Sequence, residues 1–288
     1  TSALNGRNNG DQLNEAGETW GWFKGGFSLS EDGTCASSHP QIAFDKAAGV
    51  DPETDPLRIR DYVPHHNPFQ YFASTANPTH TEPETIANVG KTDRANHIYD
   101  LSWFWRALEH GNLPTISFLK APAYQNGHPG NSNPLDEQTF LVDTLNRLQR
   151  THEWQSMAVI IAWDDSDGWY DHVMPPIVNR SHTPQDYLCG ETSDGPGGRC
   201  GYGPRLPLLV ISPYAKENYV SSRLTDQTSI LRFIEDHWLD GERMSDISFD
   251  RFAGSIEEMF DFSEPSARRL YLDRWTGLVT DESSLDAN

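Results

Sequence analysis

The sequence predicts an α/β protein with a central, mostly parallel sheet and helices on both faces. Two observations favour this class. Several apolar runs are of strand length and almost uninterrupted, which is typical of buried parallel strands, and helix-length segments with an amphipathic period accompany them. Over residues 1–288 the order is strand, helix, strand, loop, strand and helix, and we expect one large domain with a sizeable core.

The N-terminal part is expected to hold a helix, a strand and a long loop. A helix is predicted from about Gly10 to Gly17, where the glycine ends it, and TWGWFKGGF is typical of a strand followed by a glycine turn. Residues from about Glu31 to His80 are rich in Pro, Asp and His without a sustained period, which indicates a long structured loop. From about Arg94 to His110 the apolar residues recur at helical spacing, so a helix closed by Gly111 is expected.

The remaining chain alternates strands and helices. The segment Thr115–Leu119 is short and β-branched, and Pro114 and Lys120 bound it, so we expect a buried strand. Two further helices and two further strands are predicted, in the order helix, strand, strand, helix. The first helix lies within 133–154, and the two strands lie within 156–163 and 206–213. The second helix ends near Trp238, and Thr225 or Asp226 is expected to cap its start.

The chain is strongly acidic. Its 22 Lys and Arg against 42 Asp and Glu give a formal net charge of −20. Such a surface repels phosphate backbones and anionic bilayers, so we expect no nucleic-acid partner and no electrostatic membrane docking. No run approaches the roughly 18 apolar residues of a membrane span, so no transmembrane segment is expected. The 9 Trp, 10 Tyr and 13 Phe exclude a disordered chain.

The three cysteines suggest an oxidising compartment. Cys189 and Cys200 share a glycine-rich loop in which a short disulfide is sterically easy. Cys35 is then left over, either as a buried thiol or as a bridge to a segment outside this chain. The close cysteine pair and the high acidity favour a secreted or periplasmic protein.

A dense acidic cluster follows the strand predicted within 156–163. Four carboxylates and a histidine lie within the nine residues 164–172, beginning with Asp164 and Asp165. In α/β sheets functional groups collect where strands end, and carboxylate oxygens suit hard divalent cations. The alternative is a solvated acidic loop, which is common in so acidic a chain.

Three histidines lie in loops that proline and glycine stiffen. His65 and His66 lie between Pro64 and Pro68, and His128 follows the strand Thr115–Leu119. Imidazoles beside a metal-bound phosphate could orient it, neutralise its charge or protonate a leaving group. A loop histidine is often only a surface residue, but three of them near an acidic strand end indicate metal-assisted hydrolysis.

Long motifs add a resemblance. The sequence from about Asp11 to Phe262 resembles the bacterial phospholipase C and acid phosphatase phosphoesterase family, whose fold is related to alkaline phosphatase. The motifs that carry it are DQLNEAGETWGWFKGGF, DYVPHHNPFQYFASTANP, NLPTISFLKAPAYQNGHPG, AVIIAWDDSDGWYDHV and CGYGPRLPLLVISPYAK. The resemblance implies that Asp164 and Asp165 ligate the active-site metal. It also implies that His128, His65 and His66 contact the phosphoryl group.

Two family features are missing from this chain. Members carry a Glu-Asn metal pair in a motif like ENRSFD, and a Thr or Ser nucleophile before an Asn-Arg, and neither occurs here. The chain therefore resembles the C-terminal portion of the family's domain. Ser166 is the nearest hydroxyl to the aspartates, but the family places its nucleophile elsewhere. We expect a companion polypeptide to supply the rest of the site, with Cys35 as a possible bridge.

The sequence thus predicts a phosphoric ester hydrolase that acts through a covalent phospho-enzyme and one divalent metal ion. The metal could be Ca, Mg, Mn or Zn, and the substrate a phospholipid or a soluble phosphate ester. Two alternatives stay open. One is a catalytically inactive binding or scaffold protein that keeps the fold, and the other is a sulfatase or phosphodiesterase relative.

Overall fold

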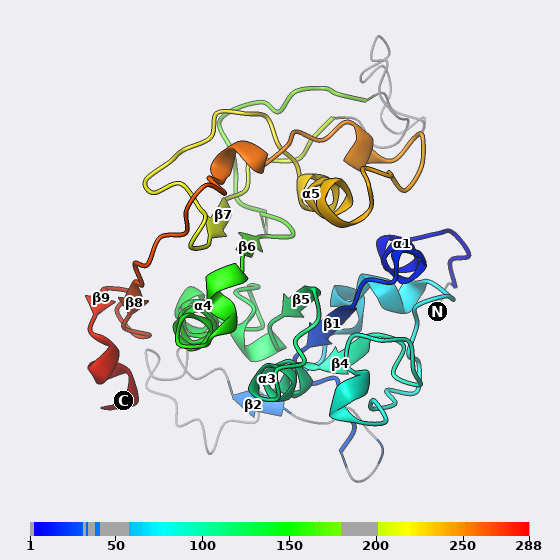
Figure 1. Cartoon of the computed structure of the whole chain (residues 1–288), viewed down its shortest axis with the longest axis horizontal. Helices are drawn as coiled ribbons and strands as arrows, with labels where there is room; N and C mark the ends of the chain where they lie inside the picture. The colour runs from blue at the N-terminus through cyan, green and yellow to red at the C-terminus, as the bar shows by residue number, and fades with distance from the viewer. Residues whose placement is uncertain are drawn as a thin grey trace. The chain divides into compact units, whose positions relative to one another are not determined.

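A computed structural model describes residues 3–30, 33, 38–40, 58–166, 168–179 and 201–287. The chain divides into two compact units (Figure 1). Unit 1 comprises Thr1–Arg150 and Arg269–Asn288, and unit 2 comprises Thr151–Arg268. Unit 2 is therefore inserted in sequence between two parts of unit 1.

A three-stranded parallel sheet forms the centre of unit 1. Its strand order is β4-β1-β5, with β1 at Trp20–Lys24, β4 at Ile98–Asp100 and β5 at Ile116–Lys120. Trp20 and Phe23 on the central strand are completely buried. The parallel direction places the carboxyl ends of all three strands at one edge, where ligand-binding loops commonly lie.

Helix α3, Leu101–Glu109, packs on this sheet (Figure 1). Asp100 caps it, because its carboxylate accepts the Ser102 N–H at 3.0 Å. The helix predicted from Arg94 thus begins later than expected. Residues Ile98–Asp100 pair with β1 as a strand, and this tertiary pairing overrides the helical period.

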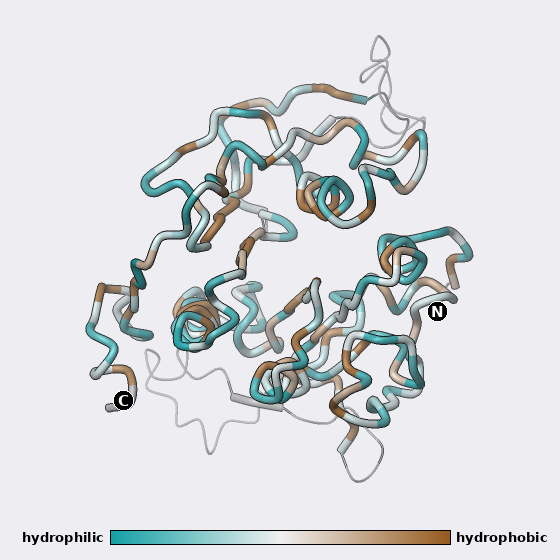
Figure 2. Tube along the Cα trace, in the orientation of Figure 1, coloured by the Kyte–Doolittle hydropathy of each residue, from teal (hydrophilic) through white to brown (hydrophobic). Residues whose placement is uncertain are grey.

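Helices α1, Asn9–Ala16, and α4, Pro134–Gln149, were both predicted, and their ends have clear causes. Each begins with a capping box, formed by Asn8 with Asp11 and by Asn133 with Asp136. Gly17 ends α1 in the left-handed region, at φ 77°. Apolar stretches concentrate in the strands and along the helices (Figure 2), and none of the described helices is long and apolar enough to cross a bilayer.

Short elements occupy the predicted loop and the other connections. Strands β2, Ser38–Pro40, and β3, Arg58–Arg60, pair antiparallel. Short 3-10 helices lie at Pro64–His66, Pro68–Tyr71, Ile86–Asn88, Ala123–Gln125, Glu153–Ser156, Phe249–Arg251, Glu257–Met259 and Glu282–Ala287.

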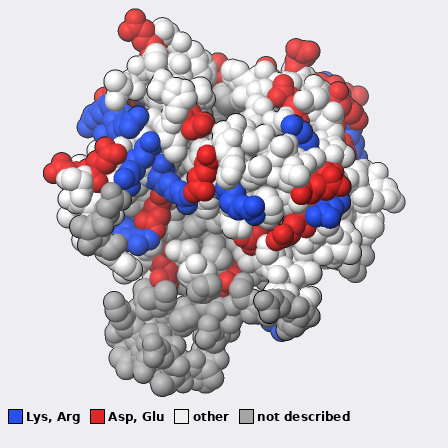
Figure 3. Space-filling model, turned by 60° about the horizontal axis from the view of Figure 1, so that its bottom comes forward, with Lys and Arg blue, Asp and Glu red and all other residues white. Residues whose placement is uncertain are grey.

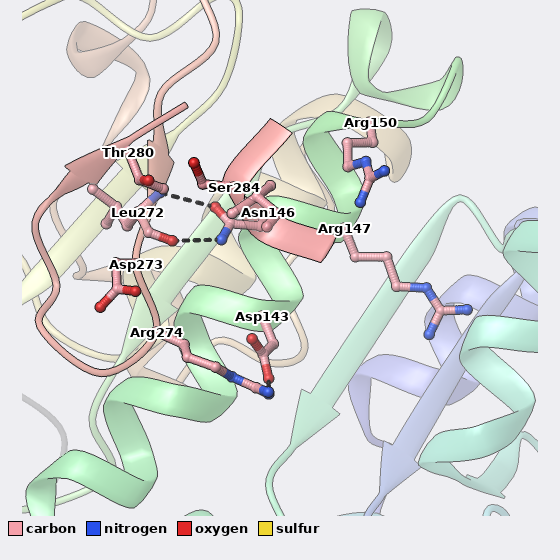
Figure 4. A pocket seen from close by; sticks show the side chains of 10 residues that line it. Asp143, Asn146, Arg147, Arg150, Leu272, Asp273, Arg274, Thr280 and Ser284 are labelled. Carbon is pink, nitrogen blue, oxygen red and sulfur yellow. Dashed lines mark hydrogen bonds and ion pairs between the residues drawn. The ribbon is translucent and has the colours of Figure 1, made fainter. Parts of the chain in front are cut away.

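The C-terminal segment returns to unit 1 as a small hairpin of β8, Tyr271–Leu272, and β9, Val279–Thr280. Side-chain amides of α4 hold it. Gln149 accepts the Leu270 N–H and donates to its carbonyl, both at 2.9 Å. Asn146 makes the same pair of bonds to Leu272, at 3.1 and 2.7 Å (Figure 4). Two side-chain amides on α4 therefore bind backbone groups of this segment that a neighbouring strand would otherwise bind.

Unit 2 contains an antiparallel pair of strands, β6, Val159–Ala162, and β7, Leu208–Ile211. Helix α5, Thr228–Trp238, contributes Phe233 to a cluster with Ile256 and Phe260, which packs against both strands. The cluster lets this unit bury an apolar core of its own.

The structure confirms the predicted α/β character only in a coarse form. Among the described strands, parallel pairing is limited to the three strands of unit 1, and β6 and β7 pair antiparallel. The sheet is therefore smaller than the central sheet that the sequence predicts, and the alkaline-phosphatase-like fold stays a prediction.

Candidate functional site

His65 and His66 lie in a 3-10 turn, Pro64–His66, that follows β3. The His66 N–H donates to the Val63 carbonyl at 3.1 Å, which closes the turn. His65 is exposed and His66 is half-buried. Downstream of the pair, Phe69 is buried and fixes this loop to the sheet.

Phe69 contacts aromatic rings on two strands. Its ring centroid lies 5.6 Å from that of Trp22 on β1 and 5.7 Å from that of Phe118 on β5. Trp22 and Phe118 are register partners with centroids 5.8 Å apart. The histidine pair is therefore anchored above the sheet by a three-ring cluster.

His128 lies at the end of the loop that leaves β5. The preceding Gly127 has φ 75°, and a Cβ there would meet a Glu137 carboxylate oxygen at 2.5 Å, so the turn requires glycine. The His128 Nδ1 lies 2.6 Å from the Pro129 carbonyl oxygen. A carbonyl oxygen only accepts a hydrogen bond, so Nδ1 of His128 carries a hydrogen.

The structure brings these histidines together. The ring centroids of His66 and His128 are 6.5 Å apart, and those of His65 and His66 are 4.4 Å apart. With hydrogen bonds of about 2.8 Å on either side, one phosphoryl group can bridge the His66 and His128 rings. The two loops cross-link at their bases, where the Ala123 N–H donates to the Asp61 carbonyl at 2.9 Å.

The base of the His128 loop is shielded from water. Asp61 is buried, and burial, with a smaller contribution from this carboxylate, raises the pKa of Tyr124. The Tyr124 hydroxyl therefore stays protonated at neutral pH. Hydrogen bonds in such surroundings are stronger than in water.

Asp164 and Asp165 follow β6 in unit 2, and both are exposed. The Gln227 side chain fixes their backbone by donating to the Trp163 and Asp164 carbonyls at 2.9 and 2.6 Å. Two adjacent exposed carboxylates match the oxygen-donor chemistry of a hard divalent cation. Among the described residues no group of three or more His, Cys, Asp or Glu is arranged to hold a metal, so further ligands would be required.

Asp171, in the same acidic cluster, has a different role. Its carboxylate accepts from Nε, Nη2 and the backbone N–H of Arg205, each at 2.9 Å. The side-chain bonds to Arg205 and the backbone bond from Val173 hold the pKa of Asp171 far below its usual range. This carboxylate therefore binds the segment after β6 to Arg205. Asp167 lies outside the described residues.

The sequence of this chain is similar to those of known phosphoesterases. The model of the Phosphoesterase family matches residues 2–239. The chain belongs to this family. The resemblance predicted from the motifs is thus confirmed.

The relatives in the family include bacterial phospholipases C. A non-hemolytic phospholipase C of Pseudomonas aeruginosa is 32% identical over 170 residues, which cover 54% of this chain and 24% of the relative. A second one, of Burkholderia pseudomallei, is 28% identical over 207 residues, covering 67% and 28%. Phospholipase C A of Mycobacterium tuberculosis is 29% identical over 161 residues, covering 53% and 30%. The matched region spans less than a third of each relative.

The cysteine prediction lies outside the described residues. Cys35, Cys189 and Cys200 all fall in that part of the chain. The disulfide between Cys189 and Cys200 stays a prediction.

Sequence reasoning did not single out two buried polar residues beside the histidine loops. Lys24, at the end of β1, and Asn67, directly after His66, are both completely buried. No described residue hydrogen-bonds the side-chain amide of Asn67. The available signal was a lysine that ends an aromatic strand before two glycines, and an asparagine between His66 and Pro68.

A cavity of about 330 Å³ between α4 and the C-terminal hairpin is also lined by arginines (Figure 4). Each arginine pairs with a carboxylate: Arg147 with Glu109, Arg150 with Glu282 and Arg274 with Asp143. Basic and acidic side chains are likewise interspersed over the face drawn in Figure 3. These pairings leave the cavity poorly suited to a phosphate, so we assign it no part in catalysis.

Proposed function

We propose that this protein hydrolyses phosphoric esters, with the phosphoryl group held between His66 and His128. The 6.5 Å separation of these two rings is the observation that carries the proposal. His65 lies beside them and is assigned a supporting role. Membership of the Phosphoesterase family and similarity to phospholipases C support the reaction class.

The chemistry follows from the histidine geometry. The hydrogen bond from Nδ1 to the Pro129 carbonyl fixes the orientation of the His128 ring. A hydroxyl nucleophile releases its proton to solvent as it attacks phosphorus, the ester P–O bond breaks, and the departing alkoxide takes a proton from the His128 imidazolium. Water then gives a proton to the neutral His128 imidazole as it attacks phosphorus, the enzyme O–P bond breaks, and the nucleophile oxygen takes a proton from solvent, which restores the hydroxyl and the imidazolium. His66 donates a hydrogen bond to a phosphoryl oxygen and offsets its charge.

Asp164 and Asp165 would hold a divalent metal in this proposal. Such an ion would supply Lewis-acid chemistry: it can lower the pKa of a hydroxyl nucleophile and offset negative charge on a phosphate ester. The aspartates supply two of the six or more oxygens that such an ion takes. We assign the remaining ligands and the nucleophile to a companion polypeptide, and propose an extracytoplasmic site of action.

The test joins metal content with activity. We expect Asp165→Ala to lose bound metal and phosphate ester hydrolysis together, while Asp246→Ala, which removes a fully exposed carboxylate elsewhere in unit 2, keeps both. Phosphate mono- and diesters, phosphatidylcholine and a sulfate ester serve as substrates. Full metal occupancy in Asp165→Ala would contradict the metal assignment. Hydrolysis of the sulfate ester alone would identify a sulfatase, and no hydrolysis by the intact assembly would indicate a scaffold.

A further inference from the structure

Lys24 is a completely buried lysine at the carboxyl end of the central strand β1. Burying an ammonium group is costly, and lysine is almost never fully buried without partners. A methionine would fill a similar apolar volume at no such cost. The charged end of Lys24 therefore has a role that packing alone does not explain.

The ammonium group holds the start of the His128 loop. Lys24 Nζ donates to the Ala121 carbonyl at 2.5 Å. The next residue, Gly25, donates its N–H to the Lys120 carbonyl at 3.0 Å. Lys24, which ends β1, and Gly25, which follows it, thus bind two consecutive carbonyls at the point where the chain leaves β5 toward His128.

The loop with His65 and His66 starts from the same place. Gly26 has φ 76°, and a Cβ there would lie 2.5 Å from the Asp61 Cβ. A Cβ on Gly25 would lie 2.5 Å from the Pro122 nitrogen. The hydrogen bond from the Ala123 N–H to the Asp61 carbonyl adds to these contacts. Together they hold residues 24–26, 61–62 and 121–123 against one another, and we call these three segments the loop junction.

We propose that Lys24 is a positioning residue, which holds the loop junction and thereby sets the separation of His66 and His128. This inference rests on the proposed function. Without the ammonium group the Ala121 carbonyl loses its buried donor, and the loop that carries His128 is less firmly fixed. A displacement of about 1 Å at a reacting group lowers the rate about 100-fold.

The decisive variant is Lys24→Met, assayed with p-nitrophenyl phosphate and a p-nitrophenyl phosphodiester. We expect kcat to fall about 30- to 100-fold while KM changes less than about threefold, because the loss concerns geometry rather than substrate binding. The control Lys91→Met removes an exposed positive charge from the same unit and should keep kcat within twofold. Circular dichroism at the assay temperature gives the folded fraction of each variant. A kcat within threefold of wild type, or a loss fully explained by the unfolded fraction, overturns the inference.

A second measurement does not depend on activity. Hydrogen exchange at the Ala123 and Gly127 amides, which donate to Asp61 and to the Ser132 hydroxyl, should accelerate more than tenfold in Lys24→Met. Exchange at the Trp22 amide of β1 should stay unchanged. Gly26→Ala, which disturbs the junction from its other side, should accelerate the same two amides. If wild type hydrolyses no ester, the proposed function fails, and this exchange experiment alone decides the positioning role. Unchanged exchange at both amides would refute it.

Discussion

Glu235 offers a sharp test of how unit 2 is stabilised. Its carboxyl group, on α5, is completely buried, and Asp250, which it hydrogen-bonds, is buried too. Arg243 donates to Glu235 at 3.1 Å and also pairs with Asp236. Burial and the Asp250 carboxylate raise the pKa of Glu235 to about 8, so Glu235 keeps its proton at neutral pH and shares it with Asp250.

The sign of the resulting pH dependence is fixed. Between pH 4.5 and about 8 the folded protein keeps a proton that the unfolded chain has released, so the free energy of unfolding falls as pH rises. Each unit of pKa difference is worth about 1.4 kcal/mol, which sets an upper limit of about 5 kcal/mol at pH 8. Glu235→Gln keeps the shape and a donor for Asp250 without needing a proton. We expect it to stabilise unit 2 by about 2 to 3 kcal/mol at pH 8 and by less than about 1 kcal/mol at pH 5.

Urea denaturation at pH 5, 6, 7 and 8 measures this difference. The difference in the free energy of unfolding between wild type and variant is taken at each pH, because the contributions of the other titrating groups cancel in it. Glu242→Gln, at an exposed position nearby, should show no pH-dependent difference. A Glu235→Gln effect that is constant with pH, or a variant less stable than wild type at pH 8, would refute the shared proton.

Two further predictions concern unit 1. The buried His97 ring stacks on Trp20 and donates from Nδ1 to its carbonyl at 3.0 Å. Burial lowers the pKa of His97 below 6.5, so the stability it contributes is complete above pH 6.5 and is lost as pH falls; an imidazole that titrates by NMR at or above 6.5 would contradict this. Gln149→Leu removes both bonds to Leu270 and should cost about 1 to 3 kcal/mol in urea denaturation, and the Leu270 amide should exchange faster. Unchanged exchange would show that the amide contact does not hold the hairpin.

Local sequence signals located the helices and strands well. Gly17 ends α1 as predicted, and the apolar runs mark strands that the structure confirms. The cap predicted at Thr225 or Asp226 was wrong, because α5 begins at Thr228 and Gln227 is its N-cap residue. The start of α3 was wrong because Ile98–Asp100 carries a period compatible with either structure, and pairing with β1 decides it. Pairing direction is a property of distant segments, so the antiparallel β6 and β7 were not predicted.

The site was predictable where a motif fixes a loop to a strand end. Proline on either side of His65 and His66, and the glycine before His128, indicated rigid loops at the sheet edge, and the two loops do meet. No local pattern predicts the hydrogen bonds that bring the two loops together. The bond from Lys24 to Ala121 joins positions 97 residues apart, and neither local period nor composition reports on such a contact.

The central claim is that His128 takes part in phosphoryl transfer. The most direct measurement is the pH–rate profile of phosphate ester hydrolysis by wild type and His128→Ala. We expect kcat to fall by about two to four orders of magnitude, with loss of the limb that reports the protonated imidazole. His110→Ala, at an exposed imidazole whose Nδ1 likewise bonds a nearby carbonyl, should leave the profile intact. An unchanged rate and profile in His128→Ala would contradict the account.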